Sequence, residues 1–201
     1  ISRIKYEVLK KVEEEISYIN ANNIIALKYD DSEYPYRLKE CVDAPIVIYC
    51  MGNTDLNSDR QIAVVGTRNP SIEGKEATRM IIEDLAINKV LVISGLAYGI
   101  DTEAHKSALN NNLLTVAVVG HGLSIIYPAE NRKLAEKIID SGGCIISEYI
   151  SSTGIDKGNF PARNRIIAGL SDCVLVVESK KKGGALITAE VANSYNREVF
   201  A

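Results

Sequence analysis

The sequence predicts an α/β fold: a doubly wound, mostly parallel sheet with helices on both faces, preceded by a small N-terminal helical segment. From residue 61 onward, short apolar runs recur, and each ends in a small or polar residue. Stretches with helical spacing of apolar residues separate the runs. Because the runs are apolar at successive positions, both faces of each strand are expected to be buried, as in a parallel sheet.

The first 60 residues have a different pattern from the rest. Residues 2–20 place apolar side chains on one helical face, residues 24–29 suit a short strand or an extended link, and residues 46–50 suit a strand. A polar connector, residues 52–60, follows. We therefore divide the chain into a partial N-terminal helical segment, residues 1–30, and a main domain, residues 31–201, whose core begins near residue 60.

Strands and helices alternate through the main domain. The expected strands are 62–65, 90–93, 115–119, 144–146, 173–177 and 199–200, and the expected helices are 72–88, 100–111, 131–141, 162–170 and 185–195. Right-handed crossovers then place the carboxyl ends of all these strands at one edge of the sheet, where open α/β sheets bind ligands.

Composition excludes several functions. No apolar run is long enough to span a membrane, so we expect no membrane partner and a cytoplasmic location. Four cysteines without a CxxC pair and only two histidines predict reduced thiols and no zinc site. The net charge is −3, yet basic residues outnumber acidic ones by seven to four in residues 157–201. Such a local excess suits a phosphate ligand at one site.

Small residues gather at the predicted strand ends. Glycine lets backbone amides approach a phosphate closely, and a following helix N-terminus adds partial positive charge. The sequence has neither GxGxxG after the first core strand nor GxxxxGK[ST], so we expect no dinucleotide and no other cofactor. The predicted strand-end binding residues are Gly66, Thr67, Arg68, Ser94, Gly95, Gly120, Gly122, Gly183 and Gly184.

Two segments supply charge. Arg68 directly follows the first core strand, where its guanidinium is expected either to clamp a phosphate or to pair with a carboxylate. In residues 157–165, Lys157 and Arg163 flank Phe160, a composition typical of single-stranded nucleic-acid sites, although Phe160 also suits packing beneath the loop. Arg163 and Arg165 are two residues apart on a helix, so one of them is expected to form an internal salt bridge.

Catalysis is poorly supported. Asp101 opens a helix and His105 follows one turn later, which suits a charge at a helix N-terminus or, alternatively, a catalytic pair. No nucleophile with an orienting third group accompanies them, so we predict no catalytic residue and no enzyme activity.

Several motifs in chain order resemble the DprA/Smf family of DNA-processing proteins. They run from about residue 34 to the end of the chain, and the block from Phe160 to Ser171 is the most specific. The motifs are Val64–Arg68, Ser94–Asp101 with Ala104 and His105, Tyr127–Asn131, Ser147–Tyr149, Phe160–Ser171 and Leu186–Ala189.

This resemblance implies an extended Rossmann-like fold that binds single-stranded DNA without catalysis. It implies that the protein protects incoming DNA in natural transformation, helps load RecA recombinase and forms a homodimer through the region after about residue 178. Arg68, the glycine loops, Lys157 and Phe160 would contact DNA. Family members often add an N-terminal helical domain and a C-terminal winged-helix domain. Residues 1–30 would be a remnant of the first, and we expect the second to lie outside residues 1–201.

Two departures affect the expected affinity. The usual Ser-Gly-Ser before Leu186 is Gly183-Gly184-Ala185, and a position that is basic in some relatives is Ala129. An alternative function is that of a LOG-like phosphoribohydrolase of nucleoside monophosphates. Residues 183–190 echo the signature of those enzymes, with the threonine out of register, and Glu190 would be the acid.

Overall fold

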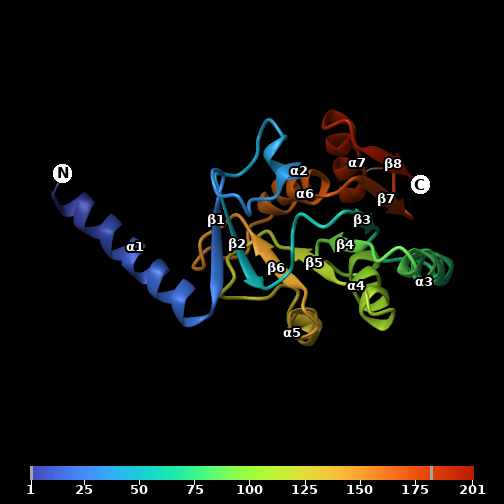
Figure 1. Cartoon of the computed structure of the whole chain (residues 1–201), viewed down its shortest axis with the longest axis horizontal. Helices are drawn as coiled ribbons and strands as arrows, with labels where there is room; N and C mark the ends of the chain where they lie inside the picture. Colours follow the sequence, from blue (N-terminus) through green and yellow to red (C-terminus); the bar gives the residue numbers. More distant parts are fainter. Residues whose placement is uncertain (1, 182) are drawn as a thin grey trace.

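The computed structural model, which describes residues 2–181 and 183–201, is a three-layer α/β arrangement around a mixed sheet (Figure 1). The sheet has eight strands in the order β1-β2-β6-β5-β4-β3-β7-β8. Neighbours from β6 to β8 are parallel, whereas β1 and β2 are antiparallel additions at one edge. The predicted mostly parallel, doubly wound sheet is confirmed. The strands are β1 (Ile24–Lys28), β2 (Val47–Gly52), β3 (Gln61–Gly66), β4 (Leu91–Ser94), β5 (Thr115–Val118), β6 (Cys144–Ser147), β7 (Cys173–Val177) and β8 (Glu198–Phe200).

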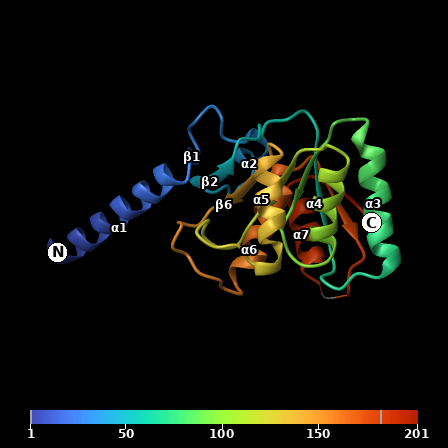
Figure 2. The same ribbon diagram turned by 90° about the horizontal axis from the view of Figure 1, so that it is seen from below.

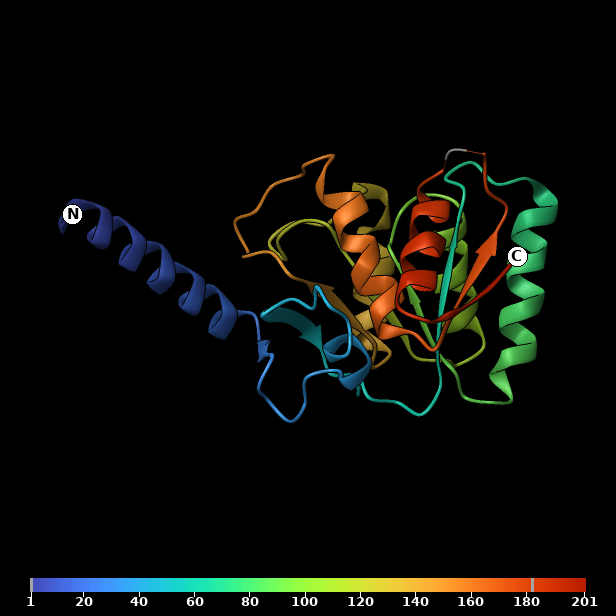
Figure 3. The same cartoon turned by 90° about the horizontal axis from the view of Figure 1, so that it is seen from above.

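Helices cover both faces of the sheet, and Figures 2 and 3 show one face each. One face carries α3 (Ile72–Ala86), α4 (Ile100–Asn110) and α5 (Arg132–Asp140), which follows the short 3-10 turn η1 (Ala129–Asn131). The other carries α2 (Tyr36–Lys39), α6 (Asn159–Leu170) and α7 (Gly184–Ser194).

The central strands are buried on both faces, as their continuous apolar runs predict. In β3, Ile62 and Val64 pack among residues of α3 and α4, whereas Ala63 and Val65 pack among residues of α6 and α7. Successive side chains of a strand point to opposite faces, so one run of four apolar residues supplies both cores.

Helix α6 begins earlier than the sequence suggests. The structure starts it at Asn159, not near residue 162, and Pro161 lies within its first turn. Proline is tolerated there because the first N–H groups of a helix have no partner within it. As a result, Phe160 is a helical residue whose direction is fixed by α6.

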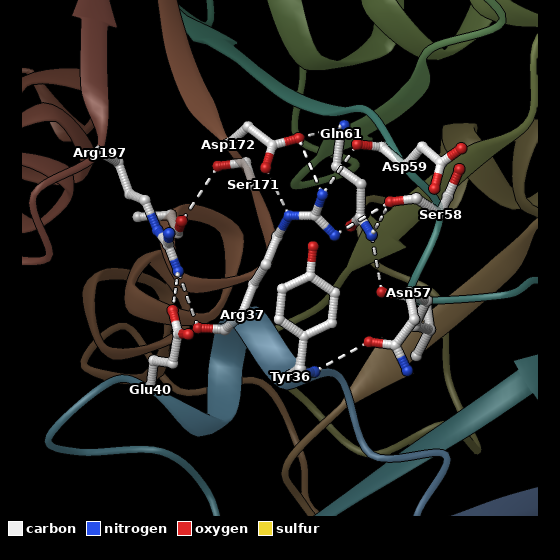
Figure 4. A network of polar contacts seen from close by, with 12 residues as sticks. Tyr36, Arg37, Glu40, Asn57, Ser58, Asp59, Gln61, Ser171, Asp172 and Arg197 are labelled. Carbon is white, nitrogen blue, oxygen red and sulfur yellow. Dashed lines mark hydrogen bonds and ion pairs between the residues drawn. The ribbon is translucent and has the colours of Figure 1, made fainter.

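The antiparallel edge joins the main domain through a buried arginine (Figure 4). Arg37 of α2 is 3% exposed, and its Nε lies 2.5 Å from Oδ1 of Asp172. Its two Nη atoms donate to the carbonyls of Ser58 and Asp59, each at 3.0 Å. Asp172 in turn accepts the Gln61 N–H at 2.8 Å. One side chain therefore links α2 to the chain just before β3 and just before β7.

Helix α1 (Ser2–Ala21) projects away from the rest of the chain (Figure 1). Near its C-terminal end, Tyr18 and Ile19 pack against the core beside α5. Strand β1 follows directly and pairs with β2, so the sheet begins before residue 30, where the sequence suggested a boundary. Among the described residues, none of the helices combines the length and the apolar character needed to cross a bilayer.

Candidate functional site

A groove of about 570 Å³ runs along the carboxyl ends of the central strands. In Figure 3 the loops that border it gather along the upper edge of the molecule. Its lining comes from the loops after β3, β4, β5, β6 and β7 and from the first turns of α6 and α7. Among the lining residues are Gly66, Thr67, Arg68, Asn69, Asp101, Tyr127, Ile155, Lys157, Phe160, Arg163, Lys180, Gly183 and Gly184.

Arg68 and two aromatic rings form one wall of the groove. The guanidinium carbon of Arg68 lies 5.7 Å from the centre of the Phe160 ring, and the rings of Phe160 and Tyr127 are 5.7 Å apart. Phe160 is half-buried and lines the groove rather than being sealed beneath the loop. Within the part of the chain that the structure describes, no carboxylate pairs with the exposed Arg68. Its charge is therefore available to a ligand.

Gly66 and Thr67 shape the loop that presents Arg68. A Cβ on Gly66 would lie 2.1 Å from the Val177 carbonyl oxygen, so only glycine fits between β7 and α4. The Thr67 N–H donates to the Glu178 carbonyl at 2.8 Å, and the Thr67 carbonyl accepts the Ile100 N–H at 3.1 Å. These bonds join the loop to its two neighbours and fix the direction in which Arg68 leaves the sheet.

Arg163 forms the floor of the groove. It is 4% exposed, and its Nη1 donates to the carbonyl oxygens of Gly95, at 2.6 Å, and Val118. A Cβ on Gly95 would lie 2.7 Å from this guanidinium, which explains the glycine. Ser94 is also buried and donates its hydroxyl to the Val64 carbonyl at 2.6 Å. The structure thus places Ser94, Gly95 and Arg163 beneath the exposed rim, where they support it.

Asp101 holds the same loop from the start of α4. Its Oδ2 accepts the N–H groups of Gly95 at 3.1 Å and Ala97 at 3.3 Å. His105 Nδ1 instead lies 2.7 Å from the Thr115 hydroxyl, which donates to the Val92 carbonyl. The two side chains therefore have separate partners, and the interpretation of Asp101 as a helix N-terminal residue fits the geometry better than a catalytic pair.

Burial perturbs both charged groups under the groove. It raises the pKa of Asp101, and the nearby positive charge of Arg163 opposes this shift. It also lowers the pKa of Arg163 to about 10, against the opposing influence of Asp101. An arginine with that pKa is still protonated at neutral pH, so the groove floor keeps a positive charge in a poorly solvated position, where electrostatic interactions are strong.

Gly120 and Gly122 are buried and lie outside the groove lining. A Cβ on Gly120 would lie 3.1 Å from the Asn159 carbonyl oxygen, and one on Gly122 would lie 2.2 Å from that of Ile150. The Gly122 N–H donates to the Thr153 carbonyl at 2.9 Å. These glycines therefore allow the loops after β5 and β6 to pack together.

The other predicted residues lie on the groove surface. Lys157 is exposed on the lip formed by the loop after β6, and Gly183 and Gly184 lie at the start of α7. Sequence reasoning missed Tyr127 and Lys180, which also line the groove. Lys180 belongs to a run of three lysines, which is also typical of a solvated loop, so the run by itself was no reason to prefer a binding role. Tyr127 was missed because its position depends on the path of a loop.

Two further sequence interpretations can be placed. Arg165 pairs with Glu148 and lies 3.7 Å from Asp43, which confirms that one of the two α6 arginines forms an internal salt bridge. Glu190 is exposed on α7 and lies outside the groove lining, so the acid expected for the phosphoribohydrolase alternative does not lie at this site. In residues 2–181 and 183–201, no three His, Cys, Asp or Glu side chains gather in a way suited to a metal ion.

Related sequences share this arrangement over most of the chain. The family model for DNA recombination-mediator protein A matches residues 25–201. Protein Smf of Synechocystis is 47% identical over 176 residues, covering 86% of this chain and 44% of its own length. DNA processing protein DprA of Streptococcus pneumoniae is 44% identical over 171 residues, covering 85% of this chain and 60% of its own length. The chain thus spans about half the length of these relatives.

Solved structures agree. DprA from Streptococcus pneumoniae superposes with a TM-score of 0.84 at 39% identity, over 92% of this chain and 65% of that one. DNA processing protein A from Helicobacter pylori, whose structure concerns its single-stranded DNA binding mode, superposes with a TM-score of 0.79 at 32% identity. The match covers 88% of this chain and 79% of that one. A molybdenum cofactor binding protein from Rippkaea orientalis, at 16% identity and 0.52, shares the fold alone. The family match, the relatives and the two structures together show that this chain belongs to the DNA recombination-mediator protein A family.

Proposed function

We propose that this chain binds single-stranded DNA along the strand-end groove, without catalysis. The observation that carries the proposal is the wall of the groove, where the exposed guanidinium of Arg68 lies over the Phe160 ring. A cation next to aromatic rings suits a strand that offers phosphates and unpaired bases together. The Helicobacter pylori relative, studied for its single-stranded DNA binding mode, supports the same ligand class.

Each part of the groove has a role in this proposal. Arg68, Lys157 and Lys180 contact phosphates, and Phe160 and Tyr127 stack on bases, each stack contributing about 1–3 kcal/mol. Arg163 adds positive charge from the floor. Because the chain offers no base-reading motif, the binding has little sequence preference.

In the cell, the proposed role is to protect incoming DNA during natural transformation and to help load RecA recombinase, with the protein acting as a homodimer. The resemblance to DprA/Smf proteins, which include DprA of Streptococcus pneumoniae and Bacillus subtilis, supports this wider role.

The test is the substitution Arg68→Ala, measured by fluorescence anisotropy with a labelled oligo-dT at low salt. Removing a charge-assisted phosphate contact is expected to weaken binding by roughly tenfold. The matched control is Arg60→Ala, which removes an exposed arginine just before β3, at the opposite end of that strand. We expect this control to stay within about twofold of the wild type because exposed charges far from a binding site are screened.

Equal affinities for the two variants would exclude Arg68 from the binding path. Release of free base from a nucleoside monophosphate by the purified protein would contradict the non-catalytic part of the proposal.

A further inference from the structure

Helix α1 reaches the loops of the groove through two polar side chains near its C-terminal end. The Glu15 carboxylate accepts the Ser151 N–H, at 2.9 and 3.0 Å to its two oxygens, and the Ser151 hydroxyl at 2.6 Å. The Tyr18 hydroxyl donates to the Leu123 carbonyl at 3.2 Å. Leu123 lies in the loop after β5, and Ser151 lies in the loop after β6. One helix therefore contacts both loops.

The two loops are also bonded to each other at this point. The Ser124 hydroxyl donates to the Ser151 carbonyl at 2.5 Å, and the Gly122 N–H donates to the Thr153 carbonyl at 2.9 Å. Ser151 is 9% exposed, so its polar groups depend on these partners rather than on water. A buried N–H that loses its acceptor is costly, which makes Glu15 a specific part of this junction.

Both loops continue directly into the groove. The loop after β5 carries Tyr127, whose ring lies 5.7 Å from that of Phe160. The loop after β6 carries Ile155 and Lys157, and it ends at the start of α6, where Phe160 lies. The junction held by Glu15 thus lies just upstream of the groove-lining parts of both loops.

We infer that Glu15 is a positioning residue that couples α1 to the lip of the DNA groove through Ser151. This inference rests on the proposed function. With the Glu15–Ser151 contact formed, the loops after β5 and β6 hold Tyr127 and Lys157 at the groove. When α1 shifts and the contact breaks, the lip loosens and affinity for single-stranded DNA falls. A movement of α1 would then change DNA affinity from outside the groove.

The test compares Glu15→Ala, which removes both acceptor oxygens of the Ser151 contact, with Glu14→Ala. Both variants remove one negative charge from the same turn of α1, and Glu14 faces Lys10 on the exposed side at 3.8 Å. Electrostatics alone would strengthen DNA binding slightly and equally in both. Coupling predicts the opposite sign for Glu15→Ala: its affinity for oligo-dT should be lower than that of Glu14→Ala by roughly three- to tenfold, which lies within the range of measured coupling effects. Thermal melts establish that both variants are folded.

A second measurement needs no DNA. Amide hydrogen exchange of residues 150–158 is expected to be faster in Glu15→Ala than in Glu14→Ala, whereas Arg68→Ala should leave it unchanged. If the wild type binds oligo-dT and the two glutamate variants bind it equally, the coupling is wrong and the proposed function stands. If the wild type does not bind oligo-dT, the proposed function is wrong, and the coupling falls with it.

Discussion

Arg163 shows how one buried side chain can build a binding surface that it barely reaches. It is nearly sealed beneath the groove, where it donates to the carbonyls that end β4 and β5. Those carbonyls belong to backbone that turns into the rim, so their orientation sets that of the loops above. Asp101 accepts backbone N–H groups of the loop at Gly95, and Arg163 donates to the Gly95 carbonyl. The loop is therefore fixed from both sides without using an exposed side chain.

His105 is the residue whose titration should be visible in stability. It is fully buried, and burial lowers its pKa to about 3. In the unfolded chain an ordinary histidine has a pKa of about 6.5. Below that value the unfolded state binds a proton that the folded state does not, so the free energy of unfolding falls as pH falls from about 6.5 towards 3. From pH 7 to pH 5 this one group should cost about 2 kcal/mol.

Urea unfolding at both pH values measures this effect. The comparison is with His105→Asn, because an asparagine amide can still donate to Thr115, as His105 Nδ1 does, and does not titrate. The variant should lose about 2 kcal/mol less than the wild type between pH 7 and pH 5. An identical loss in both proteins would mean that other groups carry the acid sensitivity. His121, whose pKa burial also lowers, is the first of these to examine.

At the scale of elements, the antiparallel edge depends on α2, a helix of only four residues. Four residues make too few helical hydrogen bonds to be stable alone, so tertiary contacts must hold α2. Leu38 enters the core of the α6 face, and Arg37 supplies the polar link to Asp172. Arg197 adds a bond to the Arg37 carbonyl at 2.9 Å, which brings the chain just before β8 into the same junction.

Arg37→Met should therefore destabilise the protein strongly. Methionine keeps most of the side-chain volume but removes the donors that Arg37 supplies to Asp172 and to the carbonyls of Ser58 and Asp59. Breaking a buried pair in this way costs about 3–5 kcal/mol. Because Asp172 is partly exposed, we expect the lower end of that range. The control, Lys39→Met on the same helix, removes a surface charge and should cost less than about 1 kcal/mol. Urea unfolding with an unchanged m-value checks both variants, and a loss under 1 kcal/mol for Arg37→Met would show that the edge is held by packing alone.

At this scale, the sequence predicted correctly those strands and helices that have a clear pattern of apolar residues. Residues 62–65 of β3 and residues 173–177 of β7 are apolar at every position. Such a run indicates a parallel strand buried on both faces, and this inference does not require knowledge of the residues that pack against it. Helix α2 gave no such signal because four residues are too short for a period. The start of α6 was misplaced because Pro161 reads as a break, although it is tolerated in a first turn.

The candidate site was predictable to the extent that topology determines it. In any parallel arrangement, the strand before Arg68 ends at the edge of the sheet where ligands bind. Arg68 lies at that edge in the structure. Arg163 was expected beside it on the surface, but the face of α6 that it occupies points inward at the ends of β4 and β5. Tyr127 lies in a long loop whose path depends on contacts with the loop after β6. Sequence spacing contains no information on such contacts.

At the scale of the whole molecule, the proposed binding surface is a small positive region on a negatively charged protein. The net charge is −3, and within residues 2–181 and 183–201 the cations exposed along the groove are Arg68, Lys157 and Lys180. Long-range attraction to DNA is therefore weak, and binding depends on the few phosphates that meet these side chains. A rigid duplex hides its bases from Phe160 and Tyr127, so it would gain the phosphate contacts without the stacking.

This arrangement predicts both the salt dependence and the strand preference of binding. About three phosphate contacts on a single strand give a slope near −2 for log K against log salt, since each contact contributes about −0.7. Losing the stacking of one or two bases should weaken duplex binding by at least about fivefold at equal salt, because each stack contributes about 1–3 kcal/mol. Anisotropy with matched single- and double-stranded oligonucleotides between about 50 and 200 mM salt measures both quantities. A slope of −5 or steeper would require phosphate contacts well beyond the groove, and equal affinity for the duplex would mean that the aromatic wall takes no part.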